Sequence, residues 1–251
     1  MPGKKSPRLR TVQKTKAPYP LNDFPKDFGY SLAREIVYLL ATKGKPVLEG
    51  QEWEEIFATC IGAEWRPSNV GLDDVVMGNC AWGAKTVKAH KPSDQKAVRL
   101  ISGRNSPVYS YGVTKISEVD PEHLGNQILE IWNDRVTGVR KYYKHLRTIV
   151  MIKSSDLSEV AVFEFETIRY DQELYLWKWN KNGNLEGFEK FTNLHRFTWQ
   201  PHGSQFTIIE DVPDDCMVVK IKLPSTLNKN QILEQIGFDK SWVTVTKKNG
   251  G

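Results

Sequence analysis

The chain has 251 residues, of which 39% are hydrophobic and 11% aromatic, so it is long and apolar enough to bury a core in one large domain. No apolar run reaches the length of a membrane span, and the N-terminus has no apolar signal core. Three scattered cysteines argue against a disulfide framework and predict a reduced, cytoplasmic setting, and the net charge of +5 suits a polyanionic partner without requiring one.

The N-terminal segment is basic. Residues 1–18 (MPGKKSPRLRTVQKTKAP) contain six Lys or Arg residues and no acid. We expect a flexible tail, which either contacts phosphates or only solubilises the chain.

Two helices and a hairpin are expected next. The apolar periodicity predicts helices over residues 30–44 and 49–65. Residues 72–77 and 81–89 are typical of two strands joined by a tight turn at Gly78–Asn79. Residues 99–112 begin as a strand and continue into a loop rich in Gly, Asn, Ser and Pro.

The remaining chain predicts a long helix and then mostly strands. Residues 122–146 form an amphipathic pattern with a basic C-terminal half, and residues 148–154 are typical of a buried strand. From Glu159 onward apolar and polar residues alternate, which predicts antiparallel hairpins, and residues 224–239 add a short helix. In this alternation Glu164 and Glu166 are expected to face solvent or a basic partner, and Trp177 and Trp179 to form a packed sheet face.

These elements predict an α/β (α+β) fold, with a mixed central sheet flanked by helices and a β-rich C-terminal half of antiparallel hairpins. We expect a single domain over residues 19–251. Its core would cover about 30–155, and its β-rich elaboration about 156–251.

The predicted hairpin contains two residues of opposite charge, Asp74 and Lys85. A short turn can place Asp74 beside Lys85, and a carboxylate that holds Mg²⁺ with a lysine that positions water are the minimum for metal-assisted phosphodiester cleavage. A second acid could come from Glu54 or Glu55 in the preceding helix. The structural alternatives are a solvated helix face and an Asp–Lys cross-strand pair that contributes less than about 1 kcal/mol.

The stretches EGQEWEEIFATCIG, GLDDVVMGNCAWGAKTVKAH and RLISGRNSPVYSYG, within residues 49–112, resemble the PD-(D/E)xK nucleases, and most of all the type II restriction endonucleases. The resemblance implies a restriction-endonuclease-like core that uses Mg²⁺. In it Asp74 matches the metal-binding aspartate, Lys85 the catalytic lysine, and Glu54 the helix carboxylate.

The sequence departs from this pattern at one position. The motif requires an acid two residues before its lysine, but Gly83 precedes Lys85 there, and Thr86 precedes Lys88. The second metal ligand would therefore be Glu54, Glu55 or Asp73.

Several residues are candidates for contacts with DNA. Arg104 and Asn105 suit bidentate contacts to guanine and adenine, and Ser106 suits a phosphate oxygen, although GRNSP is also an ordinary turn sequence. Further cations could follow the phosphate backbone or, near a helix C-terminus, only favour the helix dipole. They are Lys88, Arg140, Lys141 and Lys144.

The sequence thus predicts a Mg²⁺-dependent, sequence-specific endonuclease that cuts double-stranded DNA. A palindromic site would favour a homodimer, and the family resemblance implies a cognate DNA methyltransferase. The competing hypothesis is a non-catalytic module that binds nucleic acid or a protein partner, in which the Asp–Lys pair is structural.

Overall fold

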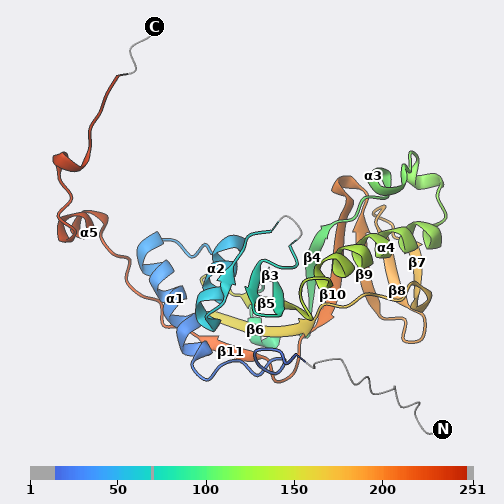
Figure 1. The fold of residues 1–251 in the computed structure, drawn as a ribbon, viewed down its shortest axis with the longest axis horizontal. Coiled ribbons are helices and arrows are strands. Elements are labelled where there is room, and N and C mark those ends of the chain that lie inside the picture. Colours follow the sequence, from blue (N-terminus) through green and yellow to red (C-terminus); the bar gives the residue numbers. More distant parts are fainter. Residues whose placement is uncertain (1–14, 69–70, 248–251) are drawn as a thin grey trace.

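The computed structural model describes residues 15–68 and 71–247, which form two β-sheets with helices packed on them (Figure 1). The first sheet has the strand order β1-β2-β3-β5-β6-β11, in which β3 and β5 run parallel and the other neighbours antiparallel. Its strands are β1 (Glu64–Trp65), β2 (Val75–Met77), β3 (Cys80–Lys88), β5 (His145–Lys153), β6 (Glu159–Glu166) and β11 (Met217–Lys220).

The second sheet is antiparallel throughout, with the order β4-β10-β9-β8-β7. Its strands are β4 (Ala97–Arg104), β7 (Tyr175–Trp179), β8 (Leu185–Glu189), β9 (His195–Gln200) and β10 (Gln205–Asp211). The α-helices are α1 (Phe28–Lys43), α2 (Gly50–Ile61), α3 (Pro107–Tyr111), α4 (Pro121–Arg140) and α5 (Lys229–Gln235).

Helices α1 and α2 cover one face of the first sheet, where Trp53, Phe57 and Trp82 share a core. Helix α2 ends at Ile61, earlier than the sequence predicts, because Gly62 adopts a left-handed conformation at φ +69° and the chain then enters β1.

Helix α4 fills the other face and joins the two sheets. It contributes Leu124, Ile128 and Trp132 to a core that also contains aromatic side chains of the second sheet. The predicted packing of Trp177 is confirmed, since its ring lies against α4 at Gly125, where a Cβ atom would stand 2.2 Å from it. The close approach therefore requires glycine.

The mixed sheet flanked by helices and the β-rich C-terminal half are confirmed, and so is the turn at Gly78 between β2 and β3. The expected division near residue 155 does not separate the sheets, because β6 and β11 join the first sheet and β4 joins the second. Of the predicted basic tail, residues 1–14 lie outside the described residues. No helix in the described ranges is both long and apolar enough to cross a membrane, and the three cysteines are free thiols.

Of the two environments expected for Glu164, solvent is wrong, because the side chain is buried against a basic residue of the same chain, Arg147. The Glu164 carboxylate is buried and accepts hydrogen bonds from Tyr19 Oη (2.6 Å), Trp82 Nε1 (2.8 Å) and Arg147 Nη1 (3.0 Å). The Asn22 side chain also bonds the Glu164 backbone. The chain before α1 thus covers this part of β6, and the alternating pattern cannot report such cover.

Candidate active site

Asp74 and Lys85 lie on the same face of the first sheet. Val75 pairs with Trp82 across the β2–β3 hairpin, so Asp74, one residue before Val75, lies opposite Gly83. Side chains alternate between the two faces of a strand, so Lys85 lies on the same face as Gly83. The Asp74 Oδ2 atom accepts the Ala84 N–H at 3.3 Å, and the Asp74 backbone oxygen accepts the Arg66 N–H at 2.8 Å.

The two side chains shift each other's charge state. Burial raises the pKa of the Asp74 carboxyl from 3.8 to about 6; the attraction of Lys85 opposes this shift and the charge of Glu54 adds to it. Burial lowers the pKa of Lys85, against the attraction of Asp74, and Arg135 lowers it further. Each group is therefore closer to neutrality than an exposed carboxylate or ammonium, a state typical of acid–base groups in active sites.

Glu54 is the second acid close to this pair. It lies on α2, accepts a hydrogen bond from Trp65 Nε1 at 3.1 Å, and acts electrostatically on both Asp74 and Lys85. Asp73 also acts on Asp74, and its Oδ1 accepts the Ser68 hydroxyl at 2.7 Å.

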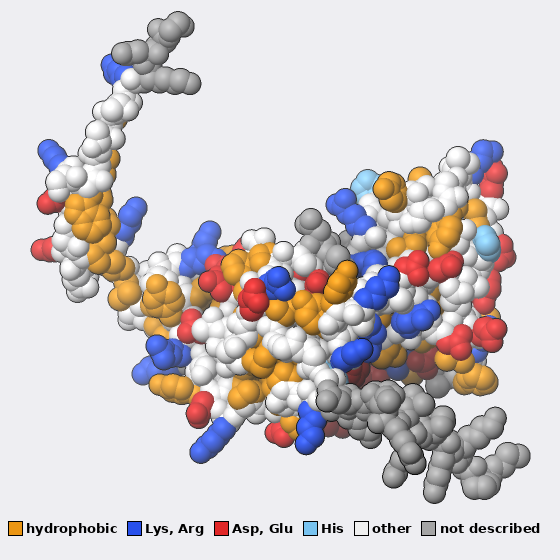
Figure 2. All heavy atoms as spheres, in the orientation of Figure 1, with side chains coloured by type: hydrophobic (Ala, Val, Ile, Leu, Met, Phe, Trp, Pro, Cys, Tyr) orange, Lys and Arg blue, Asp and Glu red, His pale blue; other side chains and the backbone are white. Residues whose placement is uncertain are grey.

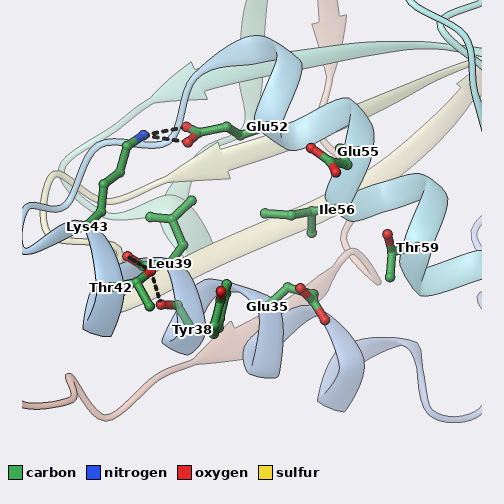
Figure 3. Close-up of a pocket in the computed structure, with 9 residues that line it drawn as sticks. All are labelled: Glu35, Tyr38, Leu39, Thr42, Lys43, Glu52, Glu55, Ile56 and Thr59. Atoms are coloured by element: carbon green, nitrogen blue, oxygen red, sulfur yellow. Dashed lines mark hydrogen bonds and ion pairs between the residues drawn. The ribbon is translucent and has the colours of Figure 1, made fainter. Parts of the chain in front are cut away.

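Glu55 does not belong to this group. It points into a groove between α1 and α2, opposite Glu35 and beside Thr59 (Figure 3). The candidates for a second metal ligand are thereby reduced to Glu54 and Asp73.

The absence of an acid at Gly83 has a steric cause. A Cβ atom at this position would stand 2.8 Å from the Gly71 backbone oxygen and 3.2 Å from Leu72 Cα. The Lys85 Nζ atom donates to the same Gly71 oxygen at 3.2 Å. The segment before β2 thus lies directly on β3, and it occupies the space that an acidic side chain at residue 83 would need.

Lys85 opens into a pocket of about 390 Å³ between the first sheet, β4 and α4. The pocket is also lined by Arg104, Arg135, Ser68 and Ser102, but both serine hydroxyls donate within the protein, to Asp73 and to the Leu100 backbone oxygen. In Figure 2, several Lys and Arg side chains gather over the part of the visible surface where α4 and the edge of the second sheet lie in Figure 1. Three cations in one pocket can bind a phosphate.

Arg135 is the site residue that the sequence did not indicate. Its Nη1 donates to the Ser102 backbone oxygen at 2.8 Å and to Asn105 Oδ1 at 3.2 Å. Gly103 permits this approach: its φ is +119°, and a Cβ atom there would stand 2.5 Å from the guanidinium. In the sequence Arg135 is one of several cations in a helix, and only the packing of α4 against β4 brings it to the pocket.

The predicted base contact of Asn105 is wrong. Its side chain is fully buried, its amide donates to the Ile128 backbone oxygen at 2.9 Å, and its own backbone oxygen accepts Trp199 Nε1 at 2.7 Å. Asn105 therefore fixes the loop between β4 and α3. Ser106 caps α3 by accepting the Tyr109 N–H, whereas Arg104 is exposed.

The predicted basic helix face is also shorter than expected, because α4 ends at Arg140. Arg140 donates to the Thr167 backbone oxygen at 2.7 Å, and Lys141 and Lys144 follow the helix as exposed side chains. Lys88 is exposed at the end of β3. All of these cations except Arg140 extend into solvent.

Within residues 15–68 and 71–247, no group of three or more His, Cys, Asp or Glu side chains is placed to hold a metal ion. Mg²⁺ is commonly bound by one or two carboxylates, several waters and substrate phosphate, and Asp74 and Glu54 are the two carboxylates that could supply the protein's part. The donor set fits this ion in hardness and in charge.

No family model, no curated protein and no solved structure matches this chain.

Proposed function

We propose that this protein is a Mg²⁺-dependent, sequence-specific endonuclease of the restriction type that hydrolyses double-stranded DNA. The observation that carries the proposal is the convergence of Asp74, Lys85 and Glu54 beside a pocket that contains Arg104 and Arg135. Acids that can hold a divalent cation next to cations that can hold a phosphate are the arrangement that metal-assisted phosphodiester hydrolysis requires.

The residues divide the chemistry between them. Asp74 and Glu54 would hold Mg²⁺, which when bound neutralises charge on the phosphate. Lys85, with its lowered pKa, positions the attacking water through a hydrogen bond and stabilises the charge that develops on the phosphate. Arg135, held in place by the Ser102 carbonyl, orients the phosphate from the other wall of the pocket.

The biological setting follows from the same proposal. Arg104, exposed at the mouth of the pocket, reads a base edge or a phosphate, and a symmetric DNA site calls for a homodimer. A restriction enzyme of this kind works in the cytoplasm beside a methyltransferase that protects the host DNA.

The proposal is tested with purified protein and a mapped plasmid, in Mg²⁺ and in EDTA. We expect discrete fragments only with Mg²⁺, and a loss of at least about a hundredfold in cleavage rate in Asp74→Asn and in Lys85→Ala. Asp215→Asn, which removes an exposed carboxylate from the loop between β10 and β11, is the control and should cut at the wild-type rate. Cutting by Asp74→Asn at the wild-type rate would refute the metal assignment.

A second candidate function is a non-catalytic nucleic-acid-binding module. It is favoured by the lack of a three-acid metal group in the described residues and by the exposed cations Lys141 and Lys144. DNA binding without fragments in Mg²⁺, unchanged in Asp74→Asn and Lys85→Ala, would support this module over the nuclease.

A further inference from the structure

The C-terminal arm, residues 222–247, carries several apolar side chains that are exposed within the described part of the chain. It leaves the body beside α1 and extends away from it (Figure 1). None of its side chains is buried. The most exposed large apolar ones include Ile236, Phe238, Trp242 and Val245, at 53%, 44%, 58% and 87%. This density of exposed apolar residues in one segment is characteristic of an interaction surface.

The arm is also too short to be stable alone. Its helix α5 has seven residues, whereas an isolated helix needs roughly 12–15 residues even to be marginal in water. Phe238 and Trp242 contact each other edge to face with ring centroids 5.6 Å apart, but no residue of the body buries them. Cover from another surface would therefore stabilise the arm.

A suitable surface lies next to the point where the arm begins. The groove between α1 and α2 has a volume of about 270 Å³; Leu39 and Ile56 form its centre, and Glu35 and Glu55 its two sides (Figure 3). One end is closed by the ion pair between Lys43 and Glu52 (Figure 3). Leu39 and Ile56 are only 9% and 8% exposed, so the apolar surface that the groove offers to the arm comes mainly from Tyr38, which also lines it and is 67% exposed.

The charges of groove and arm are complementary. Among the described residues, neither Glu35 nor Glu55 has an ion-pair or hydrogen-bond partner, whereas Glu52 is neutralised by Lys43. The arm contains four lysines and two acids, and one of the acids, Asp239, already accepts hydrogen bonds from Ser241. Lysines of the arm can therefore pair with the two carboxylates of the groove.

The geometry favours a groove on a second molecule. The Leu227 N–H donates to the Ala41 backbone oxygen at 2.9 Å, so the start of the arm is fixed at the C-terminal end of α1 and the following residues extend outward. Extended chain spans about 3.3 Å per residue and helix about 1.5 Å, so the residues from Asn228 to Lys247, of which Lys229–Gln235 are helical, are long enough to reach a neighbouring protomer. In a two-fold dimer each arm would occupy the partner's groove, and both contacts would form at once.

We propose that the C-terminal arm of one protomer binds the α1–α2 groove of a second copy of this chain and thereby forms a homodimer. The contact lies away from the Asp74–Lys85 pocket, so it holds whether or not the protein is a nuclease. It rests only on the arm, the groove and their charges.

The test is the molar mass in solution, measured by light scattering and sedimentation velocity. We expect the full chain to be a dimer and a chain that stops after Lys222 to be a monomer. Phe238→Asp with Trp242→Asp in the full chain should also give a monomer. Phe191→Asp, at an 89% exposed aromatic residue between β8 and β9 of the second sheet, should leave the dimer intact. Thermal unfolding confirms that each variant is folded, and the double substitution keeps the test decisive if the shortened chain does not fold.

Charge reversal identifies the groove. Glu35→Lys with Glu55→Lys, or Lys229→Glu with Lys240→Glu, should each raise the dimer dissociation constant about tenfold, and all four changes together should restore most of the affinity. A monomeric full chain, which would place the arm in its own groove or in none, overturns the proposal. So does a dimer that survives removal of the arm, or reversed charges that do not compensate each other.

Discussion

The buried charge of Asp74 makes the stability of the protein depend on pH, and Asp74→Asn removes that dependence. The carboxyl is 3% exposed, and burial, reinforced by Glu54 and opposed by Lys85, raises its pKa from 3.8 to about 6. The folded protein therefore holds the Asp74 proton more tightly than the unfolded chain does. As pH rises from about 4 to about 6, the unfolded chain releases this proton first, and the free energy of unfolding falls.

The magnitude follows from the shift. The pKa of Asp74 rises from 3.8 to about 6, a difference of roughly two pH units, and each unit corresponds to about 1.36 kcal/mol. Above pH 6 the ionised Asp74 therefore lowers the free energy of unfolding by about 3 kcal/mol. Asn has the shape of the neutral carboxyl, and its side-chain oxygen can accept the Ala84 N–H as Asp74 does. We therefore expect Asp74→Asn to be about 3 kcal/mol more stable than the wild type at pH 8, and about equal to it near pH 4.

The assay is urea unfolding at both pH values without divalent cations, with Asp215→Asn as the control for loss of a surface negative charge. Added Mg²⁺ should stabilise the wild type at pH 8, because it binds the folded state, and should not stabilise Asp74→Asn. A gain in stability together with a loss of cleavage is expected where a buried charge serves catalysis. The reasoning is refuted if Asp74→Asn is less stable than the wild type at pH 8, or if the two differ equally at both pH values.

Three further predictions concern neighbouring residues. Gly83→Glu, which restores the acid of the nuclease motif, should lose about 1–3 kcal/mol in urea unfolding and gain no cleavage, because the backbone of residues 71–72 occupies the space; a more active variant would contradict this steric explanation. Glu164→Ala should lose about 3–5 kcal/mol, because it removes the closer of the two carboxylates beside the buried Arg147 guanidinium, at 3.0 Å against 3.8 Å for Glu166. A loss below about 1 kcal/mol would show that water reaches the pair. Asn105→Ala should lower the free energy of unfolding by about 1–3 kcal/mol, because it removes the buried amide that bonds Ile128. Arg104→Ala should change the free energy of unfolding by less than about 0.5 kcal/mol and bind duplex DNA less tightly, and the reverse pattern would restore Asn105 as a base reader.

The parts of the site that are local in sequence could be predicted. Asp74 and Lys85 belong to one hairpin, and a tight turn at Gly78 fixes the register that brings them to one face. The helices α1, α2 and α4 have periodic apolar residues that indicate them directly, with errors only at their ends.

The parts that depend on contacts between distant segments could not be predicted. Glu164 has the alternation of an exposed strand residue, but the segment that contains Tyr19 covers it. Asn105 has the chemistry of a base reader, but α4 uses its amide at Ile128. Arg135 reaches the pocket only through the packing of that helix against β4. In each case the residue type describes what the side chain can bind, and the tertiary partner decides what it does bind.

The separation of charge in the site leads to one last prediction, that binding and cutting of DNA have different requirements. Lys85, Arg104 and Arg135 attract a phosphate without a metal, whereas Asp74 and Glu54 repel it until a divalent cation neutralises them. In EDTA the protein should therefore still bind duplex DNA, with an affinity that falls as salt rises.

Asp74→Asn, which removes one of the repelling charges, should bind DNA more tightly than the wild type in EDTA, by about tenfold if the interaction is worth roughly 1.4 kcal/mol. Fluorescence anisotropy with a labelled duplex at two salt concentrations measures this difference, and Asp215→Asn should show none. Equal binding by Asp74→Asn and the wild type would mean that the phosphate does not approach residue 74. The acids and the cations would then not form one site.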